Sequence, residues 1–364
     1  MAPLTLLALT LLPTLALSAA TQNCTPSLPP QLTNIVSFGD SYTDEDRWNY
    51  YLAHNRTWPP AGALLPESTA TASGGFVWPR FIAQKTGLRS LNYAISGSTC
   101  SHEVVHRDTA SFGAPPEFQL TFAAVRETQI PAFLADLHFE KELYAGGART
   151  PENTVYTLWV GGNDFGIGGF INGQNKNGTT LTDLVHCNWD VFDDIYAVGG
   201  RRFVFFGTQA LQHAPLYLPE DILPIDPESS WDHISTFGIP DYNAKMREYT
   251  TSVNTMLQYG LPFQGLSARW PGATVSFFDA HRLLVDVVEE PERYLETPVR
   301  EVWEMFQGRC TDFLMTDCEY NEGPLGGYVW YDELHPSERV EEIVADELIK
   351  VLAGTSEYGA TYQF

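Results

Sequence analysis

Basic residues are scarce in this sequence of 364 residues. It has 21 Lys and Arg residues against 45 Asp and Glu residues, which gives a formal net charge of −24 at pH 7. No basic run offsets this excess anywhere along the chain. Because such a surface repels phosphate groups, nucleic acid and anionic membranes are poor partners. The composition suits a neutral substrate.

The sequence also lacks any Cys-x-x-Cys pair, which argues against a structural zinc site. It contains five cysteines. Cys310 and Cys318 bracket a short loop and are the natural disulfide pair. The pairing of Cys24, Cys100 and Cys187 stays open, and the odd total leaves at least one free thiol.

Long hydrophobic runs are absent except at the N-terminus. Residues 1–20 contain no acidic group, residues 4–17 are almost entirely apolar, and Ser18-Ala19-Ala20 supplies small residues for cleavage. This pattern predicts a secretory signal peptide, although no Lys or Arg precedes the apolar core. Pro13 interrupts a run that is short for a membrane span. We therefore expect a secreted, soluble protein.

Three Asn-x-Ser/Thr triplets agree with export. They begin at Asn23, Asn55 and Asn177, and all three lie in polar surroundings. Each is a candidate N-glycosylation site in a secreted protein.

The chain shows no internal repeat, no low-complexity tract and no linker, so we expect a single domain over residues 21–364. Short apolar runs alternate with segments of helical periodicity, which is typical of a parallel sheet covered by helices on both faces. Strands are expected at residues 34–38, 90–95, 154–160, 202–206 and 274–278. Helices are expected at residues 76–86, 116–137 (kinked at Pro131), 181–198, 242–259, 280–288 and 337–352.

Polar motifs follow three of these strands and precede the last helix. They are Gly39-Asp40-Ser41, Ser96-Gly97, Gly161-Gly162-Asn163-Asp164 and Asp332-Glu-Leu-His335. The carboxyl ends of parallel strands meet at one edge of the sheet, so the motifs are expected to converge there.

Together these motifs supply the groups that ester hydrolysis needs. Ser41 is the candidate nucleophile, His335 the base, and Asp332 the group that orients the imidazole. The backbone N–H groups of Ser41 and Gly97 and the side-chain amide of Asn163 are candidate oxyanion donors. A lone serine at such a turn more often caps a helix, so the other motifs carry this interpretation.

These four motifs, in this order, resemble the SGNH (GDSL) hydrolase superfamily, and the resemblance spans residues 34–350. It implies a flavodoxin-like three-layer α/β/α sandwich, here with a central, mainly parallel five-stranded sheet, and no cofactor or metal. It also implies the roles of Ser41, Gly97, Asn163 and His335 given above.

Within the superfamily, three longer stretches are similar to fungal acetyl esterases of carbohydrate esterase family sixteen. They are Phe-Gly-Asp-Ser-Tyr-Thr-Asp, Asn-Tyr-Ala-Ile-Ser-Gly-Ser-Thr-Cys and Trp-Val-Gly-Gly-Asn-Asp-Phe. This similarity implies a monomeric enzyme that releases acetate from acetylated carbohydrates such as xylo-oligosaccharides. A GDSL lipase or a phospholipase-like esterase is the alternative, since those proteins share the motifs.

Three further motifs have competing interpretations. His102-Glu-Val-Val-His106 fits a zinc-peptidase pattern, but its context favours a surface loop. Asp279-Ala-His281 is an alternative acid–base pair, although Asp279 is well placed as a helix cap. Asp40 is expected to brace its own turn.

Substrate contacts are expected from Trp330, which lies beside the catalytic loop, and from Asp164, which also braces its loop. Trp58, Trp231 and Tyr331 are further candidates for a sugar-stacking rim around Trp330.

Overall fold

The computed structural model describes residues 28–112, 114–219, 221–222, 237–310 and 317–364. The predicted signal peptide, Asn23, Cys24 and Trp231 lie outside these residues. Within the described residues, no helix combines the length and the apolar character that crossing a bilayer requires.

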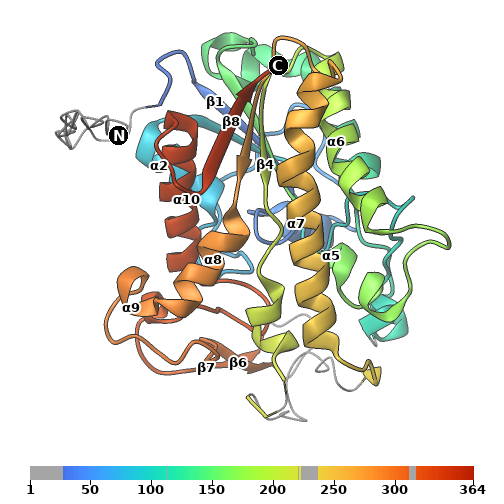
Figure 1. Cartoon of the computed structure of the whole chain (residues 1–364), viewed down its shortest axis with the longest axis vertical. Helices are drawn as coiled ribbons and strands as arrows, with labels where there is room; N and C mark the ends of the chain where they lie inside the picture. The colour runs from blue at the N-terminus through green and yellow to red at the C-terminus, as the bar shows by residue number, and fades with distance from the viewer. Residues whose placement is uncertain (1–27, 113, 220, 223–236, 311–316) are drawn as a thin grey trace, which may run out of the picture.

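A six-stranded sheet forms the centre of the molecule, in the order β2-β1-β3-β4-β5-β8 (Figure 1). The first five strands are parallel, and β8 pairs antiparallel with β5 at one edge. The strands are β1 (Asn34–Gly39), β2 (Arg89–Asn92), β3 (Thr154–Trp159), β4 (Arg202–Phe206), β5 (Thr274–Phe278) and β8 (Gly359–Gln363). A separate two-stranded sheet pairs β6 (Gln307–Cys310) with β7 (Cys318–Tyr320).

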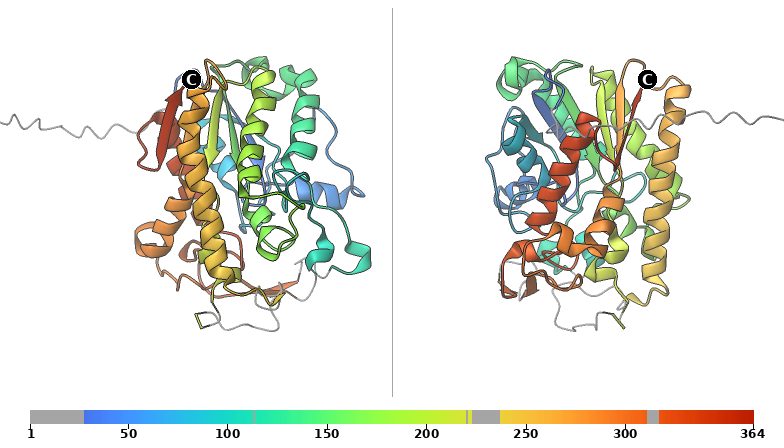
Figure 2. Two further views of the ribbon diagram at one scale, coloured as in Figure 1. Left: turned by 45° about the vertical axis from the view of Figure 1, so that its right-hand side comes forward. Right: turned by 60° about the vertical axis from the view of Figure 1, so that its left-hand side comes forward.

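Helices cover both faces of the sheet, as Figures 1 and 2 show. On one face α2 packs against α10, and on the other α6 packs against α7. The α-helices are α1 (Arg47–Ala53), α2 (Trp78–Thr86), α3 (Ile130–Asp136), α4 (Glu140–Leu143), α5 (Gly162–Phe165), α6 (Leu181–Ala197), α7 (Tyr242–Leu266), α8 (Ala280–Glu289), α9 (Pro291–Tyr294) and α10 (Glu338–Ala353). The three-layer α/β/α prediction is confirmed.

The central strands are buried along their length, which explains why apolar runs predicted them. Every residue of β1 and of β3 is buried, because helices cover both faces. The five predicted strands all form, but the predicted number of strands is wrong. β8 is a half-exposed edge strand with little apolar alternation, so pairing with β5 stabilises it more than its own pattern does.

Two helix predictions are also wrong. The helix that begins at Tyr242 does not end at Gly260 but continues through Pro262 to Leu266. A Cβ atom at Gly260 would lie 2.9 Å from the ring of Trp189, so this glycine permits close packing of α7 on α6 and does not end the helix. The residues predicted as one helix over 116–137 instead form a short 3-10 turn, an extended segment, a π-helical turn and α3 in succession.

Candidate active site

Gly39 ends β1 and turns the chain toward Ser41. Its φ of +155° lies outside the range that other residues adopt readily, and a Cβ atom there would lie 2.3 Å from the carbonyl oxygen of Trp159. Only glycine lets the first strand bend this close to the third. The bend places Ser41 at the carboxyl edge of the sheet.

Asp40 braces the turn, as the sequence predicts. Its carbonyl oxygen accepts the N–H groups of Thr43 and Asp44, and its carboxylate accepts the N–H group of Tyr42 at 3.2 Å. Gln209 on the loop after β4 donates to the same carboxylate at 3.1 Å. The turn is therefore fixed from within and from the loop after β4.

Ser41, His335 and Asp332 form a continuous hydrogen-bonded chain. Nε2 of His335 lies 2.7 Å from Oγ of Ser41, and Nδ1 lies 2.8 Å from Oδ2 of Asp332. All three residues are more than nine-tenths buried. The structure therefore brings the three candidate catalytic residues together in the order that proton transfer from a serine requires.

The loop before α10 is ordered by Asp332 itself. Its Oδ1 atom accepts the N–H groups of Leu334 and His335 at 2.8 and 2.7 Å. The carbonyl oxygen of Leu334 accepts a 2.6 Å hydrogen bond from the Tyr42 hydroxyl, which lies next to Ser41. These hydrogen bonds fix the loop so that the imidazole of His335 faces Ser41.

Activity should fall as pH decreases through the pKa of His335. Burial lowers the pKa of His335, but attraction to the Asp332 carboxylate and the hydrogen bond to it outweigh burial and raise it above its ordinary value. The imidazole must be neutral to accept the serine proton, so the acidic limb of kcat/KM should have a midpoint above about 6.5. The measurement is kcat/KM for p-nitrophenyl acetate between pH 4 and pH 9. A midpoint clearly below 6.5 would contradict the assignment.

Two backbone N–H groups beside Ser41 are available to an oxyanion. Within the described residues, neither the N–H of Ser41 nor that of Gly97 is used in a hydrogen bond. Gly97 has φ +80°, and a Cβ atom there would lie 2.1 Å from the ring of Phe122. Glycine is therefore required both by the backbone conformation and by the close approach of the ring.

Asn163 supplies a side-chain donor from the one-turn helix α5, which follows β3. Its Oδ1 atom accepts a short hydrogen bond from the guanidinium of Arg107, and its Nδ2 atom donates to the carbonyl oxygen of Ser98 at 3.0 Å. Arginine only donates, so the oxygen must face Arg107 and the amide nitrogen must face Ser98. The amide therefore has one fixed orientation, in which a second N–H remains for a substrate.

Arg107 is a residue that the motifs did not reveal. It is 7% exposed, donates through Nε to the carbonyl oxygen of Ile167 at 2.8 Å, and lies 5.3 Å from the ring centre of Phe122. Burial lowers the pKa of Arg107 to about 10, while nearby Tyr217 and Asp164 raise it, so it stays charged at neutral pH. The only signal in the sequence is one arginine shortly after Gly97.

Replacing Arg107 by lysine should lower kcat with little change in KM. Lysine cannot present two donors at fixed angles, so the Asn163 amide loses its fixed orientation. Loss of one oxyanion donor costs about 10²- to 10³-fold in kcat, which bounds the expected effect of Arg107→Lys. If Arg107 acts through Asn163, the double variant with Asn163→Ala should be no slower than Asn163→Ala alone. Additive losses would contradict this positioning role.

Two buried carboxyl groups compensate the guanidinium. Burial raises the pKa of Asp164 to about 7 and that of Asp40 to about 6, although hydrogen bonds from Cys100 and Tyr42 N–H groups oppose the shifts. Both carboxyl groups raise the pKa of Arg107 by Coulomb attraction. The cluster explains how a charged arginine persists beneath the candidate oxyanion donors.

The two predicted substrate contacts are not available to a substrate. Asp164 is 0% exposed and accepts the N–H of Cys100 through both oxygens at 3.2 Å, so it braces a neighbouring loop. Trp330 is 1% exposed and packs in the hydrophobic core. Its carbonyl oxygen accepts the N–H of Phe306 at 3.1 Å. Burial on this scale overturns both expectations.

Two disulfides connect described residues. Cys310 and Cys318 pair as predicted. Cys100 pairs with Cys187, which ties the loop after Gly97 to α6 and answers a question that the sequence left open.

The alternative motifs have other roles in the structure. The His102–His106 segment is a turn, not a helix, and its Glu103 pairs with Lys176. No group of three potential metal ligands is found among the residues that the structure describes. Asp279 accepts the N–H of Arg282 at 3.0 Å, so it caps α8 as expected.

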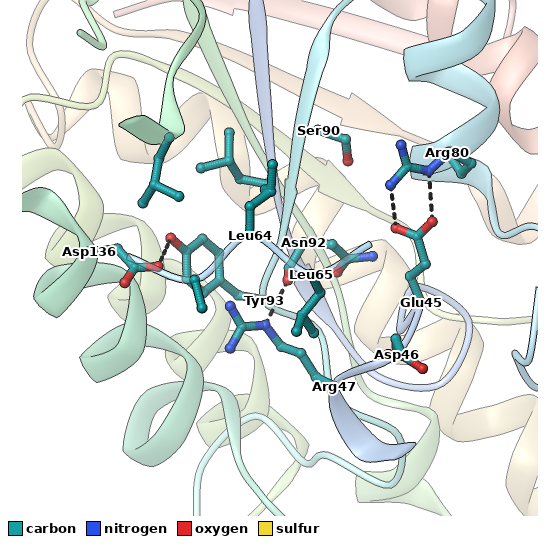
Figure 3. A pocket seen from close by; sticks show the side chains of 13 residues that line it. Glu45, Asp46, Arg47, Leu64, Leu65, Arg80, Ser90, Asn92, Tyr93 and Asp136 are labelled. Atoms are coloured by element: carbon teal, nitrogen blue, oxygen red, sulfur yellow. Dashed lines mark hydrogen bonds and ion pairs between the residues drawn. The ribbon is translucent and has the colours of Figure 1, made fainter. Parts of the chain in front are cut away.

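A small hollow lies away from Ser41, against edge strand β2 (Figure 3). Its volume of about 30 Å³ is roughly that of one water molecule. Arg80 pairs with Glu45 at its rim, and the Tyr93 hydroxyl donates to Asp136 at 2.6 Å. Nε of Arg47 donates to the carbonyl oxygen of Asn92 at 2.7 Å. These contacts brace the start of α1.

Comparison with known proteins agrees with this geometry. The sequence matches the family described as GDSL-like lipase/acylhydrolase over residues 35–348. The chain belongs to this family. It is 40% identical over 330 residues to an acetylesterase of Hypocrea jecorina, covering 90% of this chain and 91% of the relative. It is 24% identical over 336 residues to GDSL esterase/lipase EXL4 of Arabidopsis thaliana, covering 87% and 90%.

Solved structures include distant neighbours of this GDSL hydrolase. A variant of an acetyl xylan esterase from Geobacillus stearothermophilus aligns with a TM-score of 0.41 and 11% identity, over 90% of this chain and 98% of that one. The predicted resemblance to SGNH hydrolases and to fungal acetylesterases is confirmed by the family match and the Hypocrea jecorina relative. The protein is a carboxylic ester hydrolase.

Proposed function

We propose that this GDSL hydrolase is a secreted serine acetylesterase that removes acetyl groups from acetylated carbohydrates such as xylo-oligosaccharides. The observation that carries the proposal is the chain from Ser41 through His335 to Asp332, with three oxyanion donors beside it. The similarity to the acetylesterase of Hypocrea jecorina supports acetyl as the acyl group that is removed, since the two sequences align over 90% of this chain.

The chemistry proceeds in two halves. Oγ of Ser41 attacks the acetyl carbonyl carbon while its proton passes to Nε2 of His335. The N–H groups of Ser41 and Gly97 and the Asn163 amide stabilise the negative oxygen. The sugar hydroxyl leaves with the proton from His335, and an acetyl ester remains on Ser41. Water then attacks that ester and gives one proton to His335. As the bond to Oγ of Ser41 breaks, His335 returns this proton to the serine, and acetate is released.

Export is supported by chemistry in the described residues and by the pattern of the first twenty. The disulfides Cys100–Cys187 and Cys310–Cys318 need an oxidising compartment to persist. Asn55 and Asn177 are both exposed, as glycosylation requires. We expect a monomer that binds neither nucleic acid nor membranes.

The test compares rates on three substrate classes. The purified enzyme should release acetate from acetylated xylo-oligosaccharides with a higher kcat/KM than it shows for long-chain p-nitrophenyl esters, and it should leave phosphatidylcholine vesicles intact. Preference for the long-chain ester or the phospholipid would replace the acetylesterase proposal by a lipase. A chelator should leave the rate unchanged, and loss of activity with a chelator would favour a zinc enzyme.

A further inference from the structure

Four partly exposed aromatic rings form a row that begins at the oxyanion glycine. The ring of Phe122 lies against Gly97, where it would clash with any side chain. Trp48 follows it at 5.5 Å between ring centres, then Tyr51 at 5.7 Å and Trp58 at 4.1 Å. Each is only half buried, although large aromatic rings are usually covered by packing.

The geometry of the row produces a stepped apolar surface. Successive rings are nearly parallel, with interplanar angles of 27°, 21° and 22°. Stacked rings in contact lie about 3.5 Å apart in height, so rings with centres 5.5 Å apart are displaced sideways by roughly 4 Å. The neighbouring ring therefore leaves part of each ring face in the first two pairs uncovered, and all four side chains are partly exposed. Contiguous exposed apolar surface is a feature of binding sites.

The row is held rigidly to the catalytic edge of the sheet. The Asp44 carboxylate accepts the N–H of Trp48 at 3.2 Å and both the N–H and the hydroxyl of Ser96, the residue before Gly97, at 2.8 and 2.9 Å. At the outer end, Arg56 donates to the carbonyl oxygen of Glu117 at 2.8 Å. That bond ties the loop carrying Trp58 to the segment that carries Phe122. A ligand on the row is thus placed at a fixed distance from Ser41.

We infer that the rings of Trp48, Tyr51 and Trp58 bind the sugar rings of the substrate next to the one whose acetyl group is removed. A pyranose presents a flat apolar face of C–H groups with hydroxyls around its rim, so it stacks on aromatic faces and leaves its hydroxyls in water. The protein's charge of −24 disfavours anionic lipids and anionic glycans. The occupant is therefore a neutral oligosaccharide chain. This assignment rests on the proposed function and deepens it.

The kinetic test uses variants at the outer part of the row, away from the oxyanion hole. Trp58→Ala and Tyr51→Ala should each lower the ratio of kcat/KM for acetylated xylo-oligosaccharides to kcat/KM for p-nitrophenyl acetate about tenfold, mainly through KM. Trp58→Phe should restore part of this ratio. The matched control is Tyr259→Ala, which removes a ring that is 73% exposed on α7 and lies outside the row. It should leave the ratio unchanged.

The outcomes separate the row from the function on which it rests. An unchanged ratio, which equal losses on both substrates would give, would overturn the inference. A loss confined to long-chain p-nitrophenyl esters would make the row an acyl site.

Calorimetric titration of Ser41→Ala with unacetylated xylohexaose measures binding without turnover. If xylohexaose binds and Trp58→Ala abolishes the binding, the aromatic row is a sugar-binding site. This holds even if the enzyme releases no acetate from glycans, in which case only the proposed function fails. Absence of xylohexaose binding would overturn the row alone.

Discussion

Replacing Ser41 by alanine is expected to lower kcat for p-nitrophenyl acetate by about 10⁴- to 10⁶-fold and to leave the fold intact. Among the described residues, the Ser41 hydroxyl is the hydrogen-bond partner of His335 Nε2, at 2.7 Å. Alanine keeps the backbone N–H, so the candidate oxyanion donors of Ser41, Gly97 and Asn163 all remain. A small residual rate above that of water would come from these donors alone.

Strand β1, which leads to Ser41, offers a matched control for Ser41→Ala. Ser37 lies on β1 and is fully buried, and its hydroxyl has no hydrogen-bond partner among the described residues. Ser37→Ala removes the same atom from the strand that leads to Ser41 without touching the site, so it should keep full activity. The thermal midpoint of each variant, measured by circular dichroism, should stay near that of the parent. Retained turnover in folded Ser41→Ala would exclude the serine mechanism.

Local sequence predicted the parts of the fold that depend on burial. Strands β1 and β3 are covered on both faces, so most of their residues are apolar, and this pattern is visible in the sequence alone. Strand β8 is half exposed and depends on its pairing with β5, which no local pattern reveals. The continuation of α7 beyond Gly260 depends in the same way on packing against α6, where a Cβ atom at Gly260 would meet Trp189.

In the candidate site, too, some residues could be predicted from the sequence and others could not. Ser41, Gly97, Asn163 and His335 follow strands or precede a helix, so the geometry of a parallel sheet is enough to predict that they converge. Arg107 reaches Asn163 from an irregular segment, and no periodicity places that segment. Trp330 was expected at the substrate because it is close to His335 in the sequence, but its side chain packs into the core.

Aromatic residues show most clearly what the sequence could not decide. With 9 Trp, 17 Tyr and 21 Phe residues, composition does not separate packing from binding. Trp58 was one of several candidates, whereas no sequence motif singled out Trp48 or Tyr51. Their significance depends on Phe122, which is distant in sequence and lies between Trp48 and Gly97. Only tertiary structure joins these rings into one row.

Asp332→Asn is expected to lower kcat by about 10⁴-fold through the tautomer of His335, not through loss of the loop. In the parent, Asp332 Oδ1 accepts two backbone N–H groups, while both oxygens lie within 2.9 Å of Nδ1. Asparagine keeps Oδ1 for the backbone, so its NH₂ group must face Nδ1. The imidazole then carries its proton on Nε2, where it donates toward Ser41 and cannot act as the base.

A second readout distinguishes this orienting role from a structural one. The carboxylate raises the pKa of His335, so its removal should also move the acidic limb of the pH profile of Asp332→Asn to lower pH. Asp279→Asn makes the same chemical change at the cap of α8, where the residue accepts the N–H of Arg282 at 3.0 Å, and it should keep the parent rate and profile. If Asp332→Asn lost thermal stability but kept the parent pH midpoint, Asp332 would be a loop brace and another group would orient His335. Because the loop bonds survive in asparagine, the expected result is the reverse: a stable protein, a low rate and a shifted profile.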